Sequence, residues 1–177
     1  MNKKLYTAIF LSLALLVFHG SAVARPDGAR NFVTHLEGEQ EVPPRVTAAT
    51  GQAVFQLSED GMEIRYRLIV ANIENVTASH IHLGGVGVNG MIVVFLAGPF
   101  PVGGGRTDGV LAAATFTKDD LIGPLEGQEL SVLVEAMRTG GTYVNVHTND
   151  GVDPTNTGPG DFPGGEIRGQ IRPAGMP

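Results

Sequence analysis

Two neighbouring segments in which apolar and polar residues alternate constrain the fold more than any other feature of the sequence. The first covers residues 51–57 and the second covers residues 64–70, and each places an apolar side chain at every second position. Because successive side chains of a strand point to opposite faces, this period of two indicates strands with one buried face. Asp60-Gly61 lies between them and is a strong turn signal, so the two segments are predicted to form an antiparallel hairpin.

Further short segments follow, separated by glycine and proline. The chain holds 25 Gly and 11 Pro in 177 residues, which suits short strands joined by turns better than a helical bundle. One segment has helical spacing instead, with apolar residues at i, i+3, i+4 and i+7 before Gly140-Gly141. The sequence predicts a mainly β fold of about eight or nine antiparallel strands, a sandwich or barrel, with one short helix. The helical residues are Leu130, Leu133, Val134 and Met137.

The N-terminus has the three parts of a secretory signal peptide. Lys3 and Lys4 precede an apolar run from Leu5 to about Phe18, and Ala22-Val23-Ala24 matches the pattern read by signal peptidase. The apolar run is shorter than the roughly 20 residues that a membrane-spanning helix needs. We therefore expect an exported protein, periplasmic or extracellular, without a membrane span after cleavage. The expected organisation is a signal peptide at 1–24, a lead-in at 25–30, one domain at 31–173 and a tail at 174–177.

Composition excludes several classes of function. The formal net charge is −6, and cleavage after Ala24 would remove two lysines and make it −8. No basic stripe is available to follow a phosphate backbone, so no nucleic acid is expected as a partner. The chain has no cysteine, which excludes thiolate metal sites and cysteine nucleophiles. The serines outside the signal peptide lie in no nucleophile elbow, so a serine hydrolase is not expected.

Two histidines one residue apart carry the clearest signal for chemistry. The imidazoles of His80 and His82 project from the same side of a predicted strand, where they can bind one metal ion at about 2.0–2.1 Å each. His147 ends another predicted strand, on which Tyr143 and Asn145 share its face. If the two strands are neighbours, the three histidines meet in one metal site. The alternative is that they are ordinary surface or hydrogen-bonding residues.

Other candidate ligands have weaker support. Glu41, Glu166 or water is a candidate to complete the metal shell. His35 stands alone on the first predicted strand and is interpreted as a surface residue. The aspartates of the glycine-rich loop at 149–163 do not have the spacing of an EF-hand, which argues against calcium there.

Five stretches, taken together and in this order, resemble the CHRD domain, a module named after chordin and also found singly in exported bacterial proteins. The resemblance covers roughly residues 31–173 and implies a compact, β-rich extracellular module without implying an enzyme. The connection at 149–163 departs from the family pattern because it is long. The stretches are EQEVPP at 39–44, SHIHLG at 79–84, GVNG at 87–90, YVNVHT at 143–148 and GEIRGQI at 165–171.

The histidine pattern is also similar to that of copper/zinc superoxide dismutases, which carry an H-x-H strand and a later strand ending in V-H. That resemblance implies an antiparallel β-sandwich of Greek-key type, with His80, His82 and His147 as copper-type ligands. The sequence departs from that family because it offers no bridging histidine, no second set of zinc ligands and no cysteine pair.

Three functions follow as hypotheses. The first is an exported, non-catalytic module that binds a divalent metal through the three histidines. Imidazole ligands suit copper or zinc, and copper binds more tightly to a given nitrogen site. The second is a structural or adhesion module that binds an extracellular protein, with Glu166 and Arg168 as a charged pair that supports the fold. The third is a redox enzyme of the superoxide dismutase type.

Overall fold

The computed structural model describes residues 28–175. The predicted signal peptide at 1–24 lies outside the described residues, as do residues 25–27 of the lead-in and the last two residues of the tail. No helix in the described part is long and apolar enough to cross a membrane.

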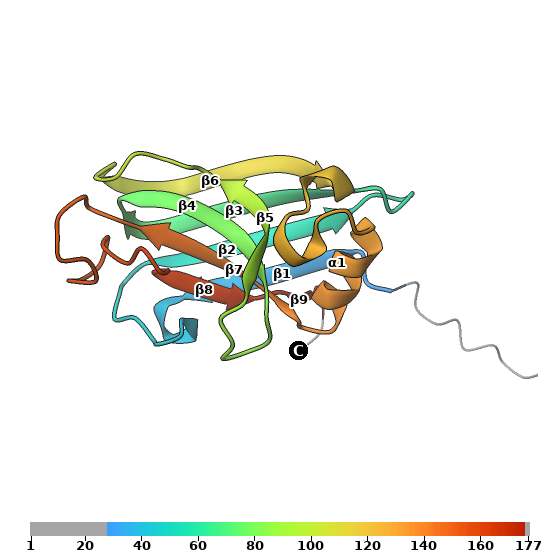
Figure 1. Cartoon of the computed structure of the whole chain (residues 1–177), viewed down its shortest axis with the longest axis horizontal. Coiled ribbons are helices and arrows are strands. Elements are labelled where there is room, and N and C mark those ends of the chain that lie inside the picture. Colours follow the sequence, from blue (N-terminus) through green and yellow to red (C-terminus); the bar gives the residue numbers. More distant parts are fainter. Residues whose placement is uncertain (1–27, 176–177) are drawn as a thin grey trace, which may run out of the picture.

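Eight antiparallel strands follow one another in a single hydrogen-bonded order, β5-β4-β7-β8-β1-β2-β3-β6, and the short β9 pairs with β1. The strands curl into a nearly closed barrel, or flattened sandwich (Figure 1). The predicted mainly β, antiparallel fold with one short helix is thus confirmed. The strands are β1 Asn31–Glu37, β2 Thr50–Leu57, β3 Glu63–Glu74, β4 Val76–Leu83, β5 Met91–Ala97, β6 Arg106–Thr117, β7 Thr142–Thr148, β8 Ile167–Gln170 and β9 Arg172–Pro173, and the helices are α1 Leu130–Arg138 and the 3-10 turns Gly38–Gln40, Lys118–Asp120 and Gly123–Leu125.

The two elements with the clearest sequence periods form as predicted. β2 and β3 make an antiparallel hairpin in which Leu57 pairs with Ile64, and the turn between them contains Asp60-Gly61. α1 has the predicted apolar positions on one side, and all four of those side chains are buried. It ends at Arg138, and Gly140 just after the cap has a φ of +69°, a left-handed conformation that glycine adopts without strain.

The core lies between the two halves of the curled sheet. Alternate residues of β2 and β3 point into it, and the same alternation on β4 and β7 buries Ile81, Val144 and Val146 completely. α1 closes one end of the strands, and the long connection between β7 and β8 lies at the other end (Figure 1). The side chains of β4 and β7 that do not enter the core therefore lie on the opposite face, which we call the outer face.

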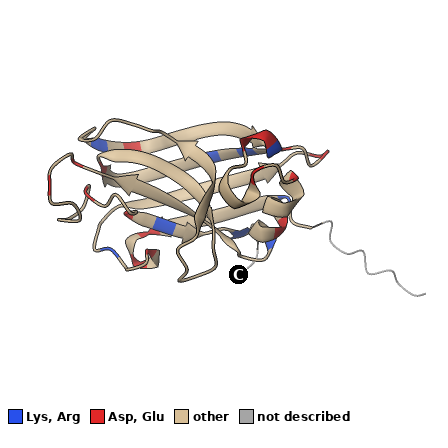
Figure 2. Cartoon of the chain, viewed as in Figure 1, with Lys and Arg blue, Asp and Glu red and all other residues tan. Residues whose placement is uncertain are grey.

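A long-range pairing positions the outer face of β4 and β7. The two strands are antiparallel neighbours although about 60 residues separate them, and His80 pairs with Asn145 while His82 pairs with Tyr143. β5 pairs with the other edge of β4, and β8 pairs with the other edge of β7. β4 and β7 hold no Lys, Arg, Asp or Glu, and the charged residues lie on other strands, turns and loops (Figure 2).

Glu166 ties the long connection to the strands. Its carboxylate is fully buried and accepts hydrogen bonds from the hydroxyls of Thr47 and Thr148 and from the backbone N–H of Gly160, at 2.6, 2.7 and 2.8 Å. A buried carboxylate held by several donors is costly to disrupt, because an unpaired charge would remain. Glu166 therefore joins the segment before β2, the end of β7 and the long connection.

The predicted charged pair between Glu166 and Arg168 is wrong. The ion pairs of the described residues do not include these two side chains. Arg168 donates instead to the carbonyl oxygens of Gly85 and Val88 and to Asn89 Oδ1 in the β4–β5 turn. Each of the two residues supports the fold, but through different loops.

Replacing Ile81 with alanine tests whether this residue belongs to a tightly packed core beneath the outer face. Ile81 is fully buried between the two histidines of β4, so Ile81→Ala is expected to lower the free energy of unfolding by about 2–5 kcal/mol. Urea denaturation monitored by circular dichroism measures this change. A loss below about 1 kcal/mol would contradict the assignment of Ile81 to a tightly packed core.

Candidate metal centre

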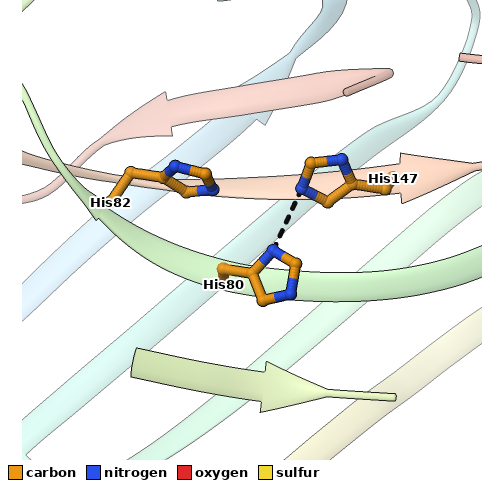
Figure 3. Close-up of side chains that lie close together, drawn as sticks. All are labelled: His80, His82 and His147. Atoms are coloured by element: carbon orange, nitrogen blue, oxygen red, sulfur yellow. Dashed lines mark hydrogen bonds between the residues drawn. The ribbon is translucent and has the colours of Figure 1, made fainter. Parts of the chain in front are cut away.

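His80, His82 and His147 meet on the outer face and are called the histidine cluster below. One ring nitrogen of each lies within 4.8 Å of those of the other two. His82 and His147 point toward each other along the strands, and His80 approaches His147 from β4 (Figure 3). The predicted convergence of the three histidines is therefore present in the structure. Among the described residues, this is the one group of three or more histidine or acidic side chains close enough to hold an ion.

Two backbone carbonyls fix the protonation of the cluster. His82 Nδ1 lies 3.0 Å from the carbonyl oxygen of Gly90, and His147 Nδ1 lies 2.8 Å from that of Pro163. A carbonyl oxygen only accepts hydrogen bonds, so each Nδ1 carries the proton and each Nε2 presents a lone pair. This is the arrangement that metal-binding histidines usually have, because the second ring nitrogen donates to a nearby acceptor and orients the ring.

His80 completes the cluster through its Nδ1 atom. That nitrogen lies 3.1 Å from His147 Nε2 (Figure 3). Because His147 Nε2 is an acceptor, His80 Nδ1 is the donor when no ion is present. The Nε2 atoms of His80 and His82 are buried and have no hydrogen-bond partner.

The spacing suits one ion. Nitrogen ligands at about 2.0–2.1 Å from an ion lie roughly 2.9 Å apart when adjacent and roughly 4.1 Å apart when opposite in a square-planar arrangement. The 3.1 Å between His80 and His147 matches an adjacent pair. The 4.8 Å limit for the whole group exceeds the opposite pair by less than 1 Å, which small side-chain rotations can supply.

Burial keeps the three imidazoles neutral. Burial, together with the nearby His147 and His82, lowers the pKa of His80 from 6.5 to about 3. Burial also lowers the pKa of His82 and of His147, against the opposing effect of the carbonyl that accepts from each ring. Neutral imidazole is the form that binds metals, so the cluster is in its binding form at neutral pH.

Aromatic rings hold two of the histidines in place. Tyr143 stacks on His82 with ring centres 4.8 Å apart and planes 12° apart, and Arg168 lies 3.4 Å above the Tyr143 ring from the β8 side. Phe95 on β5 meets His80 edge to face at 4.7 Å and is itself half exposed. The cluster therefore lies between a rigid stack on one side and a partly exposed aromatic ring on the other.

A buried polar pair lies beside the cluster. Asn145 is on the outer face opposite His80, and its Nδ2 donates to Glu41 Oε1 at 2.8 Å. Burial raises the pKa of Glu41 to about 7, against the opposing effect of Arg168 and Arg45. A side chain at Gly165, whose φ is +127°, would collide with both members of this pair. Glycine at 165 therefore lets the backbone close over Asn145 and Glu41.

The remaining candidate residues lie elsewhere. The oxygens of Glu166 accept hydrogen bonds from Thr47, Thr148 and Gly160. Glu41 accepts a hydrogen bond from Asn145, which lies beside the cluster. Neither carboxylate belongs to the group that could hold an ion in the described part of the chain, and neither do the aspartates of the long connection. His35 is on β1, where it pairs with Gln52, outside the cluster.

Sequence reasoning missed the groups that support the cluster. The carbonyls of Gly90 and Pro163 have no side-chain signature, and the alternation of residues 143–148 places Asn145 on the face of His147 without indicating a role for it. GVNG at 87–90 and GEIRGQI at 165–171 were the available signals, because each contains a glycine beside a supporting group. They were interpreted there as family motifs and not as parts of a site.

The lowered pKa of His80 makes the metal-free fold sensitive to acid. The unfolded chain takes up this proton from about pH 6.5 downward, whereas the folded chain takes it up only near pH 3, so stability falls with pH across that window. From His80 alone the loss is about 2 kcal/mol between pH 7 and pH 5. Urea denaturation in the presence of a chelator measures this, and His80→Gln is expected to flatten the pH dependence. An equal pH dependence in this variant would show that His80 is not protected from protonation.

Comparison with known proteins identifies the family. A scan against protein-family models matches the CHRD domain over residues 32–171. The search of curated proteins and the search of solved structures each returned no match. None of the comparisons shows the similarity to copper/zinc superoxide dismutases, which stays a resemblance of the histidine pattern. Since the match covers β1 to the end of β8, the chain belongs to the CHRD domain family.

Proposed function

We propose that this CHRD domain binds one divalent metal ion through His80 Nδ1, His82 Nε2 and His147 Nε2. The observation that carries the proposal is the combination of convergence and pre-orientation in the histidine cluster. Two of the three rings already donate their Nδ1 protons to backbone carbonyls, so their Nε2 lone pairs face the shared position. An ion would also give the buried Nε2 of His82 a partner, which it lacks in the metal-free cluster at a cost in stability.

Copper is the preferred ion, with zinc as the second choice. The site offers three nitrogen donors, and the chain has no cysteine to favour a softer or thiolate-bound metal. For nitrogen ligands of fixed geometry, Cu(II) binds more tightly than Zn(II). Glu41 and Glu166 are second-rank candidates as additional ligands, since each would have to leave its present hydrogen-bond partners.

Metal binding requires His80 to change tautomer. In the metal-free cluster its Nδ1 proton occupies the space between His80 and His147. An ion in that space takes the Nδ1 lone pair, and the proton then resides on Nε2, which is buried and has no hydrogen-bond partner in the metal-free cluster. The exchange keeps the ring neutral, so it needs no net uptake of protons.

The proposed setting is outside the cytoplasm. The basic, apolar and A-x-A parts of residues 1–24 support export to the periplasm or the extracellular space. A domain without cysteine is unaffected by the change of redox compartment. Holding an ion, and not turnover of a substrate, is the proposed activity, because His80 and His82 are each more than nine-tenths buried.

A second candidate function is binding of an extracellular protein. The observation that favours it is an apolar groove on the other half of the barrel, across β1, β2, β3 and β6. Val33, Val54 and Ala113 line the groove, with Arg65 and Arg67 beside them. This function would not involve the histidine cluster, so metal removal would leave it unchanged.

Metal titration of the purified chain after stripping with a chelator tests the first proposal. Copper and zinc are added separately, and binding is measured by calorimetry and by metal analysis after desalting. About one ion per chain is expected, with stabilisation of about 2.7 kcal/mol when the free ion is at 100 times its dissociation constant. His80→Ala/His147→Ala is expected to lose this binding, because a single imidazole remains.

The matched control is His35→Ala, which removes a histidine of β1 that lies outside the cluster. It is expected to bind the same amount of metal as the native chain. Equal binding by the native chain and the double variant, or no binding by either, would overturn the proposal. Urea denaturation of the double variant confirms that it is folded.

A further inference from the structure

One polar atom beside the histidine cluster has no partner within the protein. Asn145 is 97% buried, and its Oδ1 makes no hydrogen bond, although its Nδ2 donates to Glu41. A buried amide oxygen left without a partner costs free energy, so natural proteins seldom leave one unused. This atom therefore calls for a ligand or a water that is not part of the chain.

Asn145 lies next to the residues of the histidine cluster in the paired strands β4 and β7. It pairs directly with His80 across the two strands, and His147 and Tyr143 are its neighbours on the same face of β7. His82 stacks on Tyr143, and the rings of His82 and His147 point toward each other (Figure 3), on the face that Asn145 shares. An ion held by the three histidines would lie next to this residue.

The orientation of the amide is fixed from the far side. Glu41 Oε1 accepts from Nδ2, and the glycine at 165 closes over both groups without space for a side chain. When Glu41 is ionised, reversing the amide would place Oδ1 against the Glu41 oxygen and lose this hydrogen bond. Oδ1 is therefore the amide atom left without a partner, on a side chain that shares the outer face with His80 and His147.

We infer that Asn145 is a positioning residue for a fourth ligand of the ion, and that this ligand is a small neutral hydrogen-bond donor such as water. Three protein nitrogens leave a coordination position open, and a donor bound there can give its hydrogen to Asn145 Oδ1. An anionic ligand such as azide would instead meet the lone pairs of the amide oxygen and be disfavoured. This inference rests on the proposed metal site and specifies what the open position accepts.

The test uses the chain loaded with Cu(II). Pulsed electron paramagnetic resonance in H₂O and in D₂O detects exchangeable hydrogens next to the copper, and an azide titration followed by absorption measures access of an anion. The native protein is expected to show strongly coupled exchangeable hydrogens. Asn145→Leu is expected to lose their fixed orientation and to bind azide at least about tenfold more tightly, because the repelling oxygen is gone.

A double variant separates the effect of losing Asn145 from the effect of leaving Glu41 unpaired. Asn145→Leu leaves Glu41 buried without its donor, whereas Glu41→Leu/Asn145→Leu removes both partners and avoids the unpaired group. The double variant is expected to bind azide as tightly as the single one.

The outcomes separate this inference from the metal proposal. If the double variant binds one copper per chain but matches the native protein in both measurements, Asn145 does not position a fourth ligand. A native spectrum without exchangeable hydrogens would show direct coordination by another group and would also overturn the inference. Absence of copper from the native chain would overturn both proposals, and metal analysis reveals that case before the spectra are recorded.

Discussion

The pairing of β4 with β7 is the constraint on which the arrangement of the outer face depends. Its register sets His80 opposite Asn145 and His82 opposite Tyr143, and so decides which side chains can meet. A shift of one residue would turn every side chain of β4 to the other face and place the histidines in the core. Ile81 opposes such a shift, because it would then leave the core for the outer face, and Val144 and Val146 oppose a shift of β7 in the same way. The hydrophobic pattern that folds the barrel is thus also what aligns the histidine cluster.

Three loops supply the supporting contacts of the cluster, and strand pairing alone does not fix their positions. The β4–β5 turn supplies the carbonyl of Gly90 and is held by Arg168, while the long connection supplies the carbonyl of Pro163 and is held by Glu166. The segment after β1 supplies Glu41, which reaches Asn145. Buried charged groups that bind loops in this way orient the histidines more than they add stability, since a buried charge costs desolvation energy. Arg168 and Glu166 therefore connect the GVNG and GEIRGQI motifs of the family to the histidine cluster.

The strands and the shared face of His80 and His82 followed from local periodicity, whereas their meeting with His147 and the details of the site did not. Alternation in residues 51–57 and 64–70 was enough for the hairpin, and the H-x-H spacing was enough to put His80 and His82 on one face. The sequence gives the adjacency of the His147 strand only as a condition, because an alternation of period two does not show which strands pair. The Glu41–Asn145 contact spans 104 residues and the carbonyl acceptors belong to the backbone, so no sequence pattern marks them. The predicted Glu166–Arg168 pair failed for the same reason, since each side chain found closer partners in distant loops.

A crystal structure of the copper-loaded chain, with anomalous diffraction data at the copper edge, tests the central claim most directly. The account predicts one copper peak per chain on the outer face, bound by His80 Nδ1, His82 Nε2 and His147 Nε2 at about 2.0–2.1 Å. Unchanged contacts from His82 Nδ1 to Gly90 and from His147 Nδ1 to Pro163 are also expected. A peak at another place, a peak bound through His80 Nε2, or no peak at all in crystals soaked with copper would contradict the account.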